Sequence, residues 1–184
     1  MKIIAFTGAG ISKSAGIPTF EEREGIKEKL SVEFKNSHPK EFQQIMENLR
    51  KTVEGKEPTK AHKALADLQI PVITMNVDGL HQKAGSRVVF EIHGSCRDNN
   101  VVLYGQDILH KIDVMNLIIQ TARKAKSENE KAVFLVIGTS MQTAFANLLV
   151  WIAEDEGMEV HYINENADEE VPKFLKQYAF LPQE

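Results

Sequence analysis

The sequence predicts an α/β fold: a Rossmann-like parallel sheet with helices on both faces, plus a small helical module inserted after the first strand. Three observations predict it. Short apolar segments rich in β-branched residues alternate with longer amphipathic segments, which is typical of β-α-β units. The first apolar segment, residues 2–7, runs into a glycine-rich turn. A highly charged segment without strand pattern follows that turn. We therefore expect one domain over residues 1–184, with a helical insertion at about residues 21–57.

Six segments have the length and the apolar, β-branched composition of strands that are buried on both faces. They are Lys2–Thr7, Val72–Met75, Val88–Ile92, Val101–Tyr104, Val133–Ile137 and Val160–Ile163. Helical periodicity predicts helices at Lys60–Leu68, Ile112–Lys126, Ala146–Glu154 and Glu169–Lys176. The charged segment Glu21–Lys56 is expected to form two or more amphipathic helices above the ligand-binding edge of the sheet.

Composition excludes several classes of function. A net charge of −4 gives no reason to expect nucleic acid as a partner. No apolar run approaches the roughly 20 residues of a membrane helix, so no membrane partner is expected. The first strand begins directly after Met1, without a signal-like segment, which leads us to expect a cytoplasmic protein. The single cysteine, Cys96, excludes an internal disulfide and any site built from several thiolates, so no metal is expected.

The turn after the first strand has the composition of a phosphate-binding loop. Its residues are Thr7-Gly8-Ala9-Gly10-Ile11-Ser12. Glycines let the backbone approach a ligand closely, and the free N–H groups of a helix start face an anion. Lys13 stands where the dinucleotide fingerprint has its third glycine. A tight strand-to-helix turn without a ligand therefore stays open as an alternative.

Polar side chains follow the next two strands, where the carboxyl ends of a parallel sheet form the ligand crevice. Asn76 and Asp78 come after one strand and His93 after the next. An imidazole there is suited to remove a proton from a hydroxyl group. The alternatives are that His93 is a buried histidine bonded to the backbone, and that Asp78 or His81 orients the following helix. His62 is expected to pack under the helical module.

At this point the chain resembles the sirtuins, the family of NAD-dependent protein deacylases. Several motifs of that family occur in order along nearly the whole chain. They are GAGIS…GIPTF (8–20), PTKAHKAL (58–65), TMNVDGLH (74–81), IHG (92–94), VVLYGQ (101–106), GTS (138–140) and INEN (163–166).

The resemblance implies a role for each matching residue. Gly8, Ala9, Gly10 and Ser12 would hold the NAD diphosphate, and Ile17, Phe20, Asn76, Val77 and Asp78 would form the nicotinamide pocket. Gly138, Thr139, Ser140 and Asn164 would contact the adenosine half, and Val101, Val102, Leu103, Tyr104 and Gly105 would pair with a substrate peptide. His93 would be the general base, with Asn76 and Asp78 beside it in the reaction.

The reaction implied is transfer of the acyl group of an acyl-lysine to ADP-ribose, with release of nicotinamide. Two alternatives stay open. The same pocket in an NAD glycohydrolase or ADP-ribosyltransferase would break the nicotinamide bond with another nucleophile. A non-catalytic module would bind NAD or ADP-ribose without turnover. Self-association also stays open, because the absence of the family's zinc ribbon, described next, leaves apolar surface that a partner or a second copy could cover.

The chain departs from the family pattern in four places. The segment after His93 is too short for the four-cysteine zinc ribbon of most members, so a zinc-free protein is expected. The arginine that follows the GIPxF phenylalanine is Glu21, and Arg23 is the nearest replacement for its contact with the diphosphate. Met75 replaces a glutamine before Asn76, and Gln106 replaces a glutamate.

Overall fold

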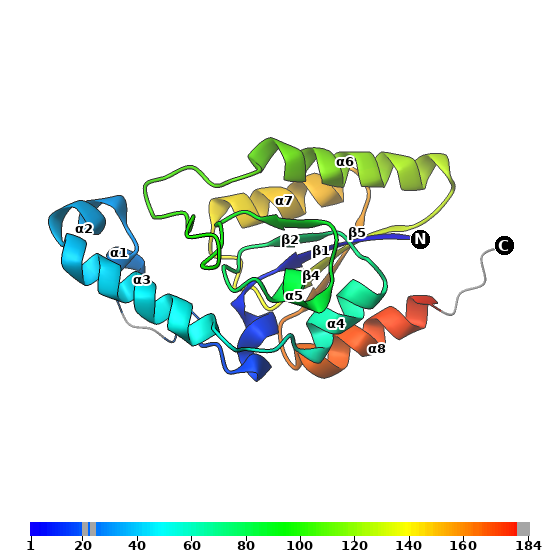
Figure 1. Cartoon of the computed structure of the whole chain (residues 1–184). Helices are drawn as coiled ribbons and strands as arrows, with labels where there is room; N and C mark the ends of the chain where they lie inside the picture. The colour runs from blue at the N-terminus through cyan, green and yellow to red at the C-terminus, as the bar shows by residue number, and fades with distance from the viewer. Residues whose placement is uncertain (20–21, 23–24, 180–184) are drawn as a thin grey trace.

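The computed structural model of the chain describes residues 1–19, 22 and 25–179. A sheet of five parallel strands in the order β3-β2-β1-β4-β5 lies at its centre (Figure 1). The order reverses between β1 and β4, and ligand crevices of such sheets open at this kind of switch point. The strands are β1 (Lys2–Thr7), β2 (Val72–Thr74), β3 (Val89–Glu91), β4 (Ala132–Ile137) and β5 (Glu159–Ile163).

The central strands are apolar because both of their faces are covered. All six residues of β4 are buried, and β4 pairs with β1 over its full length, from Lys2 opposite Ala132 to Thr7 opposite Ile137. Strands buried in this way lack the alternation of an exposed sheet, which is why continuous apolar runs predicted them. The five predicted strands that form this sheet are confirmed, and no end differs from the prediction by more than one residue.

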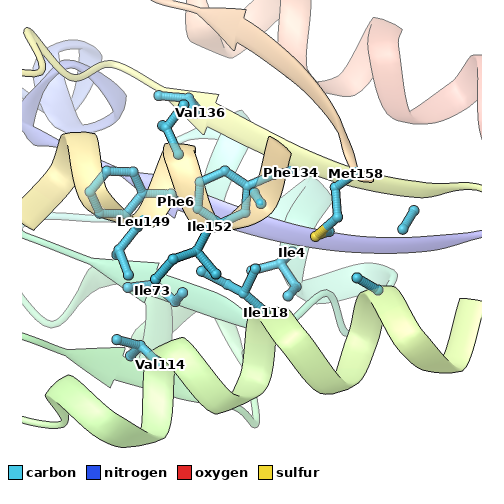
Figure 2. Packing of buried hydrophobic residues seen from close by; sticks show 14 of the residues in the cluster. Ile4, Phe6, Ile73, Val114, Ile118, Phe134, Val136, Leu149, Ile152 and Met158 are labelled. Atoms are coloured by element: carbon cyan, nitrogen blue, oxygen red, sulfur yellow. The ribbon is translucent and has the colours of Figure 1, made fainter. Parts of the chain in front are cut away.

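Helices cover both faces of the sheet. Figure 1 shows α6 and α7 on one side and α4 and α8 on the other. Phe6, Phe134, Ile118 and Leu149 are among the fully buried side chains that fill the space between the sheet and the first pair (Figure 2). The helices are α1 (Ile26–Lys29), α2 (Val32–Ser37), α3 (Pro39–Val53), α4 (Lys60–Asp67), α5 (Leu80–Ala84), α6 (Lys111–Ser127), α7 (Ala144–Asp155) and α8 (Ala167–Ala179), with a 3-10 helix at Ala9–Ala15.

Two helices next to the carboxyl edge of the sheet begin at threonines. The Thr59 hydroxyl accepts a hydrogen bond from the His62 N–H at the start of α4, and the His62 ring accepts one from the Thr59 N–H. The Thr143 hydroxyl accepts from the Ala146 N–H at the start of α7. Such caps satisfy N–H groups that a helix leaves without an internal partner. All four predicted helices are confirmed, each slightly shifted at its ends.

The charged segment after the phosphate loop contributes α1, α2 and α3, which stand beside the sheet in Figure 1. Leu30, Met46 and Leu49 form a small core of their own, which also includes Val77 and Cys96 from the sheet side. This contact fixes the helical module next to the residues that follow β2 and β3.

The predicted strand at Val101–Tyr104 is wrong. This segment forms one isolated bridge, between Tyr104 and Ser31 of the helical module, and no continuous ladder. Its backbone bonds go to different partners: the Val102 N–H to the His93 oxygen and the Tyr104 N–H to the Leu30 oxygen. The apolar composition is that of a strand, but no second strand lies along it among the residues that the structure describes.

Candidate functional site

A cavity of about 680 Å³ opens at the carboxyl edge of the sheet. Residues that directly follow all five strands line it. The predicted site residues around it are Gly8, Ala9, Gly10, Asn76, Val77, His93, Val101, Val102, Leu103, Tyr104, Gly105, Gly138, Thr139, Ser140 and Asn164. The fold therefore gathers at one cavity residues that lie up to 156 positions apart in the sequence, from Gly8 to Asn164.

A second cavity of about 40 Å³ contains the remaining described residues of the prediction. Ser12, Ile17 and Asp78 line it, and it shares Ala9, Asn76 and Val77 with the larger cavity. Phe20 and Arg23 lie outside the described residues.

The loop after β1 packs backbone to backbone against the loop after β4. The Gly10 N–H donates to the Gly138 oxygen at 2.8 Å. A Cβ atom at Gly138 would lie 2.5 Å from the Ile11 nitrogen, and one at Gly10 would lie 2.6 Å from the Gly138 Cα. No real Cβ atom fits at such distances, so this junction requires glycine on both sides. Ala9 lines the cavity, and its N–H has no partner among the described residues, which leaves it available to an anion.

Buried polar side chains connect the first two loops of the site. The Asn76 amide donates to the Ser12 hydroxyl at 3.1 Å, and this hydroxyl donates to Asp78 at 2.7 Å. The other Asp78 oxygen accepts from the Leu80 N–H at 3.0 Å, at the start of α5. Asp78 thus both orients the helix and faces the small cavity. The two readings of Asp78 that the sequence left open are compatible.

His93 is partly buried and lines the large cavity. Burial lowers its pKa below that of a free histidine. Its ring makes no hydrogen bond to any residue that the structure describes. A neutral imidazole with no protein partner can accept a proton from a bound molecule, so the geometry does not support a histidine held by the backbone.

Two further histidines lie behind the phosphate loop. His62 and His81 are fully buried, and their ring centroids are 4.5 Å apart. His81 Nε2 lies 2.9 Å from the Thr7 hydroxyl, which bonds to Thr74. His62 was expected to pack under the helical module. Its ring is buried beside His81 and caps α4 at Thr59, whose hydroxyl donates to the Ile11 oxygen. The two rings therefore support the loop after β1 through Thr7 and Ile11.

Acid is expected to destabilise the fold between pH 6.5 and 4. Burial lowers the pKa of His62 to about 4, despite the opposing charges of Asp78 and Asp168, and burial also lowers that of His81. The unfolded chain then binds more protons than the folded chain, so the free energy of unfolding falls as the pH falls. The shift of His62 alone corresponds to about 3 kcal/mol. Urea unfolding at a series of pH values measures this loss.

The matched variants are His62→Gln, which removes one buried titrating group, and His38→Gln, which changes an exposed one. The first is expected to flatten the dependence on pH above about pH 5, where carboxyl groups titrate little. The second is expected to leave it unchanged. An unfolding free energy that is the same at about pH 7 and about pH 5 contradicts this prediction.

The sequence did not identify several residues that line the two cavities. Leu30 comes from the helical module, while Ile108 and Phe145 come from the segments before α6 and at the start of α7. Cys96 lines the small cavity and is buried. It is the second residue after the IHG motif, and this position was the only signal that the sequence offered. The apolar residues carried no signal, because their patterns are those of any core.

Charged residues are also among those that line the large cavity. Lys13 and Lys27 line it, and the Lys13 ammonium lies 3.0 Å from the Glu22 carboxylate. Lys27 donates to the Gln142 side chain at 3.1 Å. Among the described lining residues, the cations therefore outnumber the single anion, which favours an anionic ligand.

Within the described ranges, no three His, Cys, Asp or Glu side chains are grouped as a metal site requires. None of the helices in those ranges is long and apolar enough to span a bilayer.

The chain is similar to named proteins over most of its length. It is 39% identical over 135 residues to an NAD-dependent protein deacetylase of Sulfolobus acidocaldarius, which covers 68% of this chain and 51% of the relative. It is 29% identical over 209 residues to an NAD-dependent protein deacylase of Aquifex aeolicus, which covers 89% and 83%. The chain spans about half the length of the curated relatives that it matches at 39 to 41% identity.

Solved structures share the fold. A Sir2 homologue in complex with NAD superimposes with a TM-score of 0.79 at 23% identity, over 97% of this chain and 89% of that one. Sir2 bound to an acetylated peptide gives a TM-score of 0.79 at 21% identity, over 98% and 94%. The profile of the Sir2 family matches residues 8–102, which run from the phosphate loop past His93 to the far wall of the cavity. With this match over half of its residues, the chain belongs to the Sir2 family.

Proposed function

We propose that the protein is an NAD-dependent protein-lysine deacylase, which moves the acyl group of a lysine side chain to ADP-ribose and releases nicotinamide. One observation carries the proposal. A single cavity joins the phosphate loop, His93 and the segment 101–106, so a dinucleotide and an acylated side chain have room to meet at the imidazole. Its volume of about 680 Å³ is within the range of small-molecule sites.

The nucleotide end fits NAD in both charge and shape. Gly8, Ala9, Gly10 and Lys13 line the large cavity where we place the diphosphate, and the Lys13 ammonium is paired there with Glu22. Ser12 lines the adjoining small cavity. The Thr139 N–H donates to the Asn164 side chain at 3.2 Å, which joins the loop after β4 to the loop after β5. Together with Gly138 and Ser140, these residues form the proposed surface for the adenosine half.

The lining of the small cavity has the groups that an amide-bearing ring would contact. Ile17 and Val77 supply apolar walls, and Asp78 supplies a carboxylate for a carboxamide N–H. The Ser12 hydroxyl holds the Asp78 carboxylate in place, and the Asn76 amide in turn holds the Ser12 hydroxyl. We assign Phe20 to the same pocket and Arg23 to the diphosphate on the resemblance of their motif alone.

His93 is the proposed general base. Its lowered pKa keeps the ring neutral at pH 7, so it can take a proton from a ribose hydroxyl and make that oxygen nucleophilic toward the acyl carbon. Asn76 lies in the same cavity and can orient the reacting groups.

The segment from Val101 to Gly105 is the proposed peptide-binding wall. An extended substrate backbone would lie along it and place the acyl-lysine side chain in the cavity. Apolar side chains of Leu30 and Leu103 line the cavity there, which suits the aliphatic stem of a lysine.

The protein is proposed to act without zinc. The short loop that replaces the ribbon closes on itself: the Asn100 side chain accepts from the Ser95 N–H at 2.7 Å, and the Asn100 N–H donates to the Ser95 oxygen. The Cys96 N–H donates to the Val77 oxygen at 2.8 Å, which ties the loop to the site. The His93 oxygen also accepts from the Val102 N–H, so backbone hydrogen bonds hold this loop beside the site.

Residues 1–184 are proposed to act as one NAD-binding domain, in which the insertion at about 21–57 covers the nucleotide. A cytoplasmic location is part of the proposal, because the sole cysteine is buried and forms no disulfide. Acyl-lysine proteins are the proposed partners.

Product analysis tests the proposed function. The purified protein is incubated with NAD, with and without an acetyl-lysine peptide, and the products are identified by mass spectrometry. We expect deacetylated peptide, nicotinamide and O-acetyl-ADP-ribose only when both substrates are present. Nicotinamide and ADP-ribose without peptide would instead identify an NAD glycohydrolase. Binding of NAD without any product, with longer acyl groups tried as well, would identify a non-catalytic module.

A further inference from the structure

The segment 101–106 has two backbone edges, and its hydrogen bonds show which edge the rest of the protein uses and which one is left for a peptide. In an extended chain, the N–H and C=O groups of one residue point to the same side, and those of the next residue point to the other. Val102 and Tyr104 both bond to the protein side, at the oxygens of His93 and Leu30. Tyr104 also accepts from the Val32 N–H. The edge left for a peptide is therefore the opposite one, with Leu103 at its centre.

A single residue, Gln106, hydrogen-bonds to both the N–H and the C=O group of Leu103. The Gln106 side chain accepts from the Leu103 N–H at 2.9 Å, and the Gln106 N–H donates to the Leu103 oxygen at 3.0 Å. A turn over residues 103–106 makes this possible, with Gly105 at a φ of 93°. Gln106 thus offers Leu103 the same acceptor and donor that one residue of an added strand would offer.

We propose that Gln106 is an internal cap on the peptide-binding edge, which an incoming substrate backbone must displace from the Leu103 N–H. The inference rests on the proposed function, since it names how that site recognises its peptide. Displacement needs only rotation of the Gln106 side chain, because the Leu103 oxygen has a second lone pair and can keep its bond to the Gln106 N–H. The cap keeps the Leu103 N–H satisfied when no peptide is bound.

The cap reduces the affinity for the peptide by the cost of breaking one hydrogen bond. A substrate backbone must therefore bond to the Leu103 N–H more strongly than the Gln106 side chain does. Substrates that cannot present a carbonyl oxygen to Leu103, such as a free acyl-lysine or a short branched acylamine, are expected to be poor. The proposed partner is thus an extended peptide segment and not an isolated acylated side chain.

The test compares Gln106→Met, which has similar length but no strong acceptor, with Gln106→Glu, which keeps an acceptor oxygen. Gln120→Met, at an exposed position of α6, is the surface control. We expect Gln106→Met to lower KM for an acetyl-lysine peptide by about 3- to 10-fold, with KM for NAD near the wild-type value. Gln106→Glu is expected to change KM for the peptide less. An unchanged or increased KM for the peptide in Gln106→Met overturns the proposal.

A second readout does not depend on activity. Amide hydrogen exchange at Leu103 is expected to be faster in Gln106→Met than in the wild type, and to slow again when the peptide is bound in the presence of ADP-ribose. Equal exchange in both proteins overturns the cap. If the wild type binds the peptide but turns nothing over, only the proposed function fails. The peptide affinity of Gln106→Met relative to the wild type then still tests whether Gln106 acts as a cap. If neither protein binds the peptide, both proposals are overturned.

Discussion

Replacing His93 by alanine is expected to lower kcat/KM for deacylation by about 10²- to 10⁴-fold, the usual contribution of a general base. The imidazole lies in the large cavity and makes no hydrogen bond within the described chain, so its removal takes away a proton acceptor and little structural support. The affinity for ADP-ribose is expected to stay within about threefold of the wild type, because no other group of the nucleotide end is changed. Steady-state kinetics and calorimetric binding measure the two quantities.

The pH profile distinguishes a base from a structural histidine. Because burial lowers the pKa of His93, the acidic limb of the profile of kcat/KM should lie below about pH 6.5. His38→Ala, which removes an exposed ring stacked on Phe34 in the helical module, is the control and should keep wild-type kinetics. A His93→Ala enzyme that retains more than about a tenth of the activity is incompatible with the proposed role.

Replacing Gly138 by alanine is expected to destabilise the protein by about 2 to 5 kcal/mol. One part of this cost is the left-handed backbone, with a φ of 60°, which alanine adopts at about 1 to 2 kcal/mol. The other part is the contact with the loop after β1, where the new Cβ would lie 2.5 Å from the Ile11 nitrogen and 2.7 Å from the Gly10 Cα. Overpacking of this kind typically costs about 1 to 3 kcal/mol. Urea unfolding monitored by circular dichroism measures the sum.

Gly157→Ala is the matched control for this experiment. Gly157 has a φ of 84°, but no atom lies within 4 Å of the position of its Cβ. It therefore carries the backbone strain without the clash, and about 1 to 2 kcal/mol is expected. Gly138→Ala should in addition weaken ADP-ribose binding, because the two loops would have to separate at the proposed diphosphate site. Equal destabilisation by the two variants would mean that the junction of the loops tolerates a side chain.

Much of the fold could be predicted from the sequence, because its strongest signals are local. Continuous apolar runs such as Val133–Ile137 are typical of strands covered on both faces, and this run lies within β4. The rule that ligands bind at the carboxyl ends of parallel strands brought Asn76, Asp78 and His93 to one edge, and the structure gathers them around two adjoining cavities.

Other features depend on contacts that no local pattern encodes. Val101–Tyr104 has the composition of a strand, but its partners are Leu30 and Val32 from the helical module and His93. The pairing of His62 with His81 joins two helices, and Cys96 lines the small cavity from a loop whose Cys96 N–H donates to the Val77 oxygen. Gly10 and Gly138 were expected to contact a ligand or to allow a turn. In the structure they also let the loops after β1 and β4 pack backbone to backbone.

The stoichiometry of the reaction is the most direct test of the central claim, that one cavity brings NAD and an acyl-lysine together at His93. Nicotinamide release and peptide deacetylation are measured in the same sample over the same interval. The account predicts one nicotinamide per deacetylated lysine, and none above background when the peptide is omitted. Nicotinamide released without peptide, or deacetylation without nicotinamide, would contradict it.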